Sequence, residues 1–393
     1  MAPVAIAGVG CICALGASYD SCMQALYAGR RNFGLPSRFP IHCETSQPVF
    51  EVPDRFLDPW PFSRTLPRTC RMTLIATEQA IAQAQLKPGD LTRPRVGVCV
   101  GTNIGVTTGY EIGQAETDSF LLPRDRFLAT NPTSLVANTL DLSGPQQTVA
   151  NACSAGSDAI GIASAWITAG YCDAVIAGGT DELTPRVYYG FKSLFINDQR
   201  PCRPFDRNRK GLNLGEGAAV FLLVSETFCR SRQIDPLGYV MGYGGAADAH
   251  HFTQPRSDGQ GLRLAIDEAL TTADVTNDQV CFVNAHGTGT PDNDLVESQV
   301  IADLFPGKPF LSTKGYTGHA LGAAGPIEAA LTLGCLTKGA LPATAGYETP
   351  DPQMPAHPVA VPTNVDGKVA ITQTLAFGGS NSVLVIGSNG CLS

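Results

Sequence analysis

The residue best suited to nucleophilic chemistry is Cys153, at a predicted turn between a short strand and a helix. The sequence from Gln147 reads QTVANACSAGSDAIGIASAWITAG, with small residues around the cysteine. A thiol at a helix start meets the helix dipole and free backbone amides, both of which favour the nucleophilic thiolate. The arrangement is similar to a nucleophile elbow. The chain has 13 cysteines, however, and most cysteines are small buried hydrophobes, so Cys153 alone identifies no site.

A second segment, VNAHGTGTPDND, places His286 directly after a predicted buried strand. A lone histidine at a strand end is more often structural than functional. The neighbouring residues change this interpretation, because Gly287 and Gly289 permit a close backbone approach, and Thr288 and Thr290 offer short hydroxyl groups. This combination suits a narrow tunnel for a linear polar substrate arm.

Two later segments complete the set of candidate residues. In STKGYTGHALGAAGPIEAAL, Lys314 lies five residues before His319, and Glu328 follows on a predicted helix. On a surface, Lys314 and Glu328 would form a solvated pair worth about 1 kcal/mol or less, whereas their apolar neighbours favour a buried supporting pair. In LAFGGSNSVLVIG, Phe377 precedes two glycines between two predicted strands. Such a turn on its own would indicate only a hairpin.

These segments lie among alternating strands and helices. Residue type, periodicity and turn residues predict strands at VAIAGVG, RVGVCVG, DAVIAGG, AAVFLLV, VCFVNAHG, ITQTLAF and SVLVIG. The same criteria predict helices over Thr73–Gln85, Ser154–Ala169, Gly261–Ala273, Asp294–Leu304 and Ile327–Lys338. Because the two kinds of element alternate, the sequence predicts an α/β fold of βαβ units with covered sheets.

Composition and charge exclude several classes of protein. Of 393 residues, 44% are hydrophobic and 16% charged, which is typical of soluble α/β enzymes rather than disordered or fibrous chains. The net charge of −8 argues against a nucleic-acid partner. No apolar stretch reaches the ~18–20 residues of a membrane span, so no membrane insertion is expected. Gly8, Gly10 and Gly16 interrupt the uncharged N-terminal run, which favours a buried strand over a signal peptide.

The cysteines indicate the compartment and bear on metal binding. They are scattered, odd in number and mostly within apolar runs, which fits a reducing, cytoplasmic environment better than a disulfide framework. No Cys-x-x-Cys pair is present, so no metal site is expected.

The domain organisation has one weak boundary. No linker rich in Pro, Ser or Gly divides the chain, and a polar, charged segment near Ser225–Pro236 separates two stretches of βαβ character. We therefore expect an N-terminal half at residues 1–230, carrying Cys153, and a C-terminal half at residues 231–393, carrying both histidines. No sequence repeat is strong enough to prove a duplication.

Taken together, the Cys, HGTGT, KxxxxH and FGG elements resemble the condensing enzymes of the thiolase superfamily, in particular β-ketoacyl-[acyl carrier protein] synthases of the I/II type. The stretch RPFDRNRKGLNLGEGAAVFLL is similar to the arginine-rich loop and following strand of that family, and the resemblance runs from about residue 4 to residue 387. It implies a thiolase fold, a five-layered αβαβα architecture of two related halves. It also implies decarboxylative condensation of carrier-bound thioesters without a metal or organic cofactor.

The resemblance implies a role for each matching catalytic residue. Cys153 would carry the acyl group. His286 and His319 would promote decarboxylation and hold the thioester oxygen, with Lys314 and Glu328 in support.

The resemblance also implies how substrates are held. Thr288 and Thr290 would contact the phosphopantetheine arm, Phe377 and Gly378 would border the acyl pocket, and the amides of Cys153 and Phe377 would form the oxyanion hole. An acidic acyl carrier protein would dock on two arginine-rich stretches, which contain Arg64, Arg68, Arg71, Arg203, Arg207 and Arg209; internal ion pairs are the alternative for these arginines.

Three related functions stay open on the sequence. A degradative thiolase would need a second cysteine near FGGSN, where none occurs. A non-catalytic chain-length factor would lack the nucleophile, and an initiating synthase would lack the TGH histidine. The GTNIGVTTGYE loop and KGYTGH depart from the commonest family pattern, which favours a dedicated pathway such as aryl polyene or polyketide synthesis. The resemblance implies a homodimer, or a heterodimer with a related chain.

Overall fold

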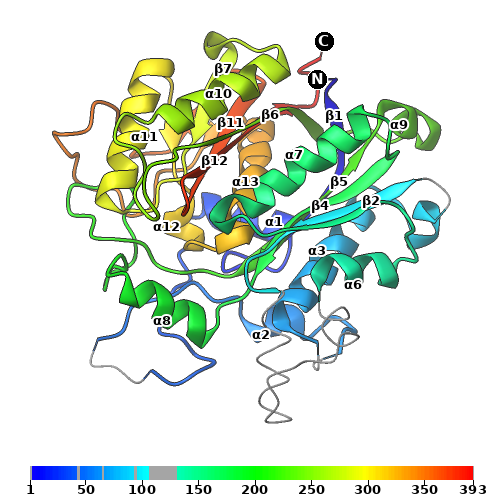
Figure 1. The fold of residues 1–393 in the computed structure, drawn as a ribbon, viewed down its shortest axis with the longest axis horizontal. Coiled ribbons are helices and arrows are strands. Elements are labelled where there is room, and N and C mark those ends of the chain that lie inside the picture. Colours follow the sequence, from blue (N-terminus) through cyan, green and yellow to red (C-terminus); the bar gives the residue numbers. More distant parts are fainter. Residues whose placement is uncertain (1, 42–44, 64–65, 93–94, 106–130, 393) are drawn as a thin grey trace.

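The computed structural model describes residues 2–41, 45–63, 66–92, 95–105 and 131–392 (Figure 1). The strands are β1 Val4–Cys13, β2 Val96–Gly101, β3 Gln146–Val149, β4 Ala174–Asp181, β5 Gly217–Val224, β6 Gly238–Ala247, β7 Val280–Asn284, β8 Phe310–Leu311, β9 Ala340–Leu341, β10 Thr363–Asn364, β11 Val369–Ala376 and β12 Ser380–Ser388. The α-helices are α1 Tyr19–Tyr27, α2 Asp54–Leu57, α3 Arg68–Gln83, α6 Pro132–Thr139, α7 Ala155–Thr168, α8 Pro185–Ser193, α9 Glu226–Arg232, α10 Gln260–Ala273, α11 Pro291–Leu304, α12 Lys314–Thr317 and α13 Ala324–Lys338.

Two groups of five strands share one topology. The first has the order β3-β2-β4-β5-β1, and the second has the order β8-β7-β11-β12-β6. When the five strands of each group are numbered by their order in the chain, the spatial order across the sheet is 3-2-4-5-1 in both groups. The pairing directions also match: two parallel pairs are followed by two antiparallel pairs in each group. A short antiparallel pairing of β1 with β6 joins the groups. The topology therefore reveals the two related halves that the sequence alone does not prove.

Helices cover both faces of each group of strands, which gives five layers (Figure 1). Helices α3 and α6 pack on the outer face of the first group, and α10 and α11 pack on the outer face of the second. Helices α7 and α13 form the middle layer, in a core shared by both halves. Strands such as β4 and β5 are buried along their whole length, as expected where both faces are covered. The predicted αβαβα architecture is confirmed.

Both halves use glycine to bring the outer helix close to the first strand. Gly8 and Gly10 of β1 face α3, while Gly242 and Gly244 of β6 face α10. A Cβ atom at any of these four positions would lie within 2.3 Å of a carbonyl oxygen of the facing helix. These glycines also explain why β6 was not predicted, because glycine-rich sequence lacks the branched and aromatic residues typical of strands.

Every strand and helix predicted above is present, and its ends differ from the predicted ends by a few residues. The seven predicted strands correspond to β1, β2, β4, β5, β7, β11 and β12, and the five predicted helices to α3, α7, α10, α11 and α13. The expected boundary between residues 230 and 231 falls within α9, between the last strand of one group and the first strand of the other. None of the described helices combines the length and apolar character needed to cross a bilayer.

Candidate active site

Cys153 lies in a short 3-10 turn, Ala152–Ser154, between β3 and α7. The preceding residue, Ala152, has a φ of +47°, a left-handed conformation that is uncommon for residues other than glycine. Such conformations persist where surrounding contacts hold them, and they are frequent at active sites. The side chain is 4% exposed, and the backbone amide of Phe377 donates a hydrogen bond to its sulfur. The strand-turn-helix position predicted for Cys153 is confirmed.

His319 occupies the matching position in the other half, in the loop between β8 and α13. Its Nε2 lies 3.1 Å from Cys153 Sγ. The GLNLGEG stretch holds the backbone of His319 on both sides: its amide donates to the Asn213 carbonyl at 2.8 Å, and its carbonyl accepts from the Gly215 amide at 2.9 Å. The pseudo-repeated βα loops therefore bring a thiol and an imidazole together from opposite halves.

His286 follows β7 and is oriented by a buried ion pair. Lys314 Nζ lies 2.8 Å from His286 Nδ1 and forms an ion pair with Glu328. An ammonium group only donates hydrogen bonds, so His286 Nδ1 accepts one and the neutral ring carries its proton on Nε2. The rings of His286 and His319 lie nearly perpendicular, with centroids 5.2 Å apart. The buried supporting pair expected for Lys314 and Glu328 is present, with each side chain 1% exposed.

Burial sets the protonation states of the site. Burial and the nearby Lys314 ammonium lower the pKa of both His286 and His319 well below the usual value, so both rings are neutral at pH 7. Burial raises the pKa of Cys153 to about 11, against the opposing effects of Lys314 and the Phe377 amide. Desolvation is the largest effect at Cys153 and favours the thiol at rest, whereas the sequence indicated a helix start that favours the thiolate. The thiol must transfer its proton as it reacts, and His319 Nε2 is placed to accept it.

Two carboxylates that sequence reasoning missed hold the HGTGT loop. Glu297 of α11 accepts hydrogen bonds from the His286 amide at 2.7 Å and the Gly287 amide at 2.6 Å. Asp294 accepts from the Gly289 amide at 3.1 Å. Both are fully buried, which raises the pKa of Glu297 to about 7 and that of Asp294 to about 6. Their spacing of three residues on the helix directly after the loop was the available signal, since such residues share one face.

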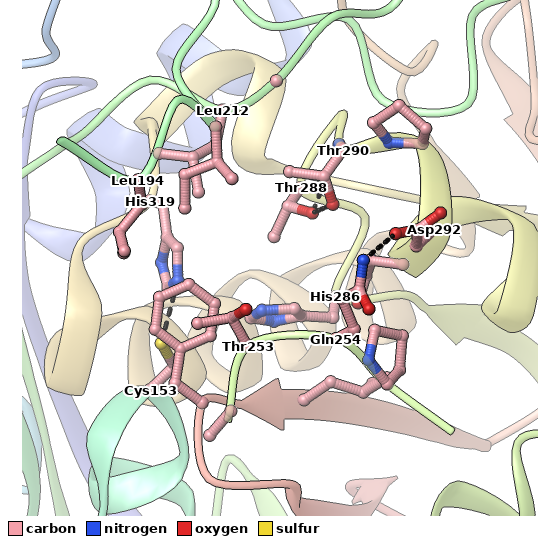
Figure 2. Close-up of a pocket in the computed structure, with 18 of the residues that line it drawn as sticks. Cys153, Leu194, Leu212, Thr253, Gln254, His286, Thr288, Thr290, Asp292 and His319 are labelled. Atoms are coloured by element: carbon pink, nitrogen blue, oxygen red, sulfur yellow. Dashed lines mark hydrogen bonds between the residues drawn. The ribbon is translucent and has the colours of Figure 1, made fainter. Parts of the chain in front are cut away.

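A cavity of about 360 Å³ joins these groups (Figure 2). Cys153, His319 and His286 lie along one part of it, and Thr288 and Thr290 face them across the open space, with their hydroxyl oxygens 2.8 Å apart. Gln254 Nε2 donates to Asp292 Oδ2 at 3.1 Å beside the threonines. The structure thus brings Cys153, both histidines and both threonines to one cavity.

Phe377 separates this cavity from a second, largely apolar one. It lines both, as does Leu194, and the second cavity has a volume of about 410 Å³. The ring of Phe377 stacks on Phe191 of α8, with centroids 5.7 Å apart and planes at 19°. Gly378 lies outside the cavity lining; it has a φ of +85°, and its amide donates to the Phe252 carbonyl at 2.8 Å. Gly378 therefore shapes the turn that carries Phe377.

Comparison with known families supports what this geometry indicates. Residues 1–228 match the beta-ketoacyl synthase N-terminal domain, and residues 237–348 match the C-terminal domain. The chain belongs to the β-ketoacyl synthase family. A relative named 3-oxoacyl-[acyl-carrier-protein] synthase 2 from Synechocystis sp. strain PCC 6803 is 33% identical, with 97% of each chain covered.

Solved structures similar to this synthase include complexes of ketosynthases with other proteins. One, described as the ishigamide ketosynthase/chain length factor, is 27% identical, with a TM-score of 0.89 over 99% of this chain and 100% of the other. Another is AntDE:AntF, a type II PKS acyl-carrier protein in complex with its ketosynthase bound to the hexaketide. It is 25% identical, with a TM-score of 0.88 over 98% of this chain and 99% of the other.

Most of the arginines expected to dock a carrier protein are engaged inside the synthase. The prediction is wrong for Arg68, which is 8% exposed and pairs with the fully buried Glu216. Arg207 has an exposed side chain, and Arg64 lies outside the described residues. The other three are largely buried beside acidic partners: Arg71 near Asp58, Arg203 near Asp198 and Arg209 near Asp351. Of the described members of this set, only Arg207 therefore presents a side chain to a partner.

The synthase also brings together three thiols that sequence reasoning did not connect. Cys11 and Cys13 of β1 and Cys22 of α1 are fully buried, and their sulfur atoms all lie within 4.8 Å of one another. All three belong to the hydrophobic core, where they pack between β1 and α1.

Proposed function

We propose that the synthase condenses an acyl group held on Cys153 with a malonyl unit held on an acyl carrier protein. The observation that carries this proposal is the 3.1 Å separation of Cys153 Sγ and His319 Nε2, beside a His286 ring that presents an Nε2 proton to the same cavity. A thiol with its base and a second, neutral donor are the groups that acyl transfer followed by decarboxylation requires.

In the first step, Cys153 exchanges thioesters. Its proton passes to His319 Nε2 as Sγ attacks the acyl carbonyl carbon, and the bond to the pantetheine sulfur breaks. His319 returns the proton to the departing thiolate, so the products are the acyl-enzyme and the free carrier thiol. We expect the amides of Cys153 and Phe377 to stabilise the tetrahedral oxyanion, because the Phe377 amide already points at Sγ.

In the second step, a malonyl thioester replaces the first substrate. Breaking the bond to its carboxylate releases CO₂ and leaves the electron pair on the α-carbon and the thioester oxygen. His286 Nε2–H is placed to donate to that oxygen as its negative charge grows. The α-carbon then attacks the acyl carbonyl on Cys153, and the Cys153 thiolate departs and takes up a proton from solvent through His319 Nε2. Side chains and backbone amides stabilise every charge that develops in these steps, so we propose that no metal or organic cofactor takes part.

The geometry of the cavity supports roles for the flanking residues. Thr288 and Thr290 are placed to hydrogen-bond the amide groups of a phosphopantetheine arm. The largely apolar cavity behind Phe377 has room for an acyl chain, and Phe377 would have to turn to admit one. We therefore propose these three as substrate-binding residues.

We also propose the partners and the setting of the reaction. Related structures are described as complexes with an acyl-carrier protein or a chain length factor, so we propose that the synthase binds a carrier protein and pairs with itself or a related chain. Strand β3 lies at the edge of its sheet and is partly exposed, which suits pairing with another strand. The similarities favour polyketide or fatty-acid synthesis. The described cysteines are all free, which supports a cytoplasmic location.

One experiment tests the proposal directly. The wild-type protein and Cys153→Ala are incubated with acyl carrier protein loaded with a short acyl chain, and intact mass is measured. We expect one acyl adduct on the wild type and none on C153A, followed by β-ketoacyl product when malonyl carrier protein is added to the wild type. Equal acylation of both proteins would refute the mechanism.

A further inference from the structure

The loop after β2 carries an asparagine, Asn103, within GTNIG, part of the segment that departs from the commonest family pattern. Its side-chain Nδ2 donates to the Ala152 carbonyl at 2.9 Å and lies 3.2 Å from Asp181 Oδ2. Both partners only accept hydrogen bonds, so the orientation of the amide group is determined by its surroundings. Asn103 therefore contacts the residue directly before Cys153.

Asp181, at the end of β4, anchors this asparagine. Its carboxylate is fully buried and accepts from the Thr102 hydroxyl at 2.7 Å and the Ile104 amide at 2.9 Å. It also accepts from the Gly322 amide at 2.8 Å, three residues after His319. One carboxylate thus joins the loop that carries Asn103 to the loop that carries His319.

The two catalytic loops are also in direct contact, so a small movement of either one changes the site. A Cβ atom at Gly156, at the start of α7, would lie 2.3 Å from the Gly322 carbonyl oxygen. Close packing of this kind transmits a shift in one loop to the other. Asn103 and Asp181 therefore connect the turn that carries Cys153 to the loop that carries His319.

We propose that Asn103 is a positioning residue, which holds the left-handed Ala152 turn through the Ala152 carbonyl and so sets the approach of Cys153 Sγ to His319 Nε2, with Asp181 as its anchor. The proposal rests on the proposed function of Cys153 and His319 and adds a residue that touches no reacting atom. Without the amide group, the Ala152 carbonyl loses its donor and the strained turn loses a restraint.

The test uses the reaction of Cys153 with iodoacetamide, which needs no carrier substrate. Asn103→Ala is compared with Asn277→Ala, because Asn277 Nδ2 donates to the Leu304 carbonyl at 2.9 Å and does not line the active-site cavity. Alkylation rates are measured by intact mass across pH, beside self-acylation rates with acyl carrier protein. We expect both rates to fall about tenfold in N103A, the loss expected for one hydrogen bond, and to stay unchanged in N277A. The pH of half-maximal alkylation should rise in N103A.

Further variants and outcomes make the result decisive. Asn103→Asp cannot donate to Ala152 and adds a charge beside Asp181, so it should be at least as slow; Asn103→Ser replaces N103A if that variant fails to fold. Wild-type alkylation rates in a folded variant would overturn the proposal. An effect confined to KM for long acyl chains would also overturn it, because Asn103 lines the apolar cavity as well. Alkylation of wild-type Cys153 without acyl-enzyme formation would instead refute the proposed function.

Discussion

Lys314 Nζ lies 2.8 Å from Nδ1 of His286, and this contact determines which nitrogen of the ring faces the substrate cavity. Because the ammonium group cannot accept a hydrogen bond, His286 presents Nε2–H to the thioester oxygen. Burial and the same positive charge lower the pKa of His286 and keep it a neutral donor. Lys314 thus acts through His286, and Glu328 keeps the lysine in place.

The first prediction separates this orienting role from a purely structural one. Lys314→Met should reduce CO₂ release from malonyl carrier protein by about 100-fold or more, because the donor tautomer is no longer selected. The single variant also leaves Glu328 without its partner, which costs stability. The double variant K314M/E328L should recover much of the unfolding midpoint without recovering decarboxylation. Recovery of both would show that Lys314 only supports the fold.

The second prediction concerns pH and stability. Burial raises the pKa of Glu297 from 4.5 to about 7, so the folded state binds this proton more tightly than the unfolded state. The resulting stabilisation is fully present below pH 4.5 and is lost as the pH rises through 7. Glu297→Gln has no such proton, so the free energy of unfolding, measured by denaturant titration, should fall less between these pH values than in the wild type.

Other buried carboxylates also titrate in this range, so the difference between the two proteins is the quantity that reports on Glu297. Glu226→Gln is the matched control, because Glu226 is exposed and pairs with Arg230 on the surface of α9. Its pH dependence should follow the wild type. A Glu297→Gln curve parallel to the wild type would contradict the prediction.

Sequence reasoning found the residues proposed to react and the Lys314–Glu328 pair beside His286, and missed the carboxylates that hold the loops. Cys153, His286 and His319 were recognisable because residue type and local motif report chemical capacity. Glu297, Asp181 and the strand β6 were not, because their roles depend on which surfaces the two halves bring together.

The burial of Arg68 and of Cys153 was missed for a related reason. Charged residues were expected to be exposed, whereas Arg68 is buried against Glu216. A cysteine at a helix start was expected to favour the thiolate, whereas desolvation raises the pKa of Cys153 to about 11. Local sequence carries no measure of burial at either position. The fold class was easier to predict than burial, because buried strands and amphipathic helices each have a recognisable sequence pattern.

The third prediction concerns primer size. Phe377 lines both cavities and stacks on Phe191, so Phe191→Ala should free the ring to turn away from the passage. We expect kcat/KM for long acyl primers to rise relative to short ones, with Cys153 alkylation unchanged. Tyr171→Ala, which removes an exposed aromatic ring beyond α7, is the control and should leave the ratio unchanged. An unaltered ratio in F191A would exclude Phe191 from control of the passage.

The last prediction tests the reassignment of Arg68 from docking to structure. Glu216 is fully buried and receives hydrogen bonds from Arg68, Arg38 and the Val52 amide. Arg68→Met leaves much of that buried charge uncompensated and should lower the free energy of unfolding by about 3–5 kcal/mol. Arg230→Met, in an exposed pair with Glu226, should cost less than about 1 kcal/mol. If R68M instead kept wild-type stability and weakened only carrier-protein binding, the docking role would be restored, because a side chain that the fold needs cannot be removed without a thermodynamic cost.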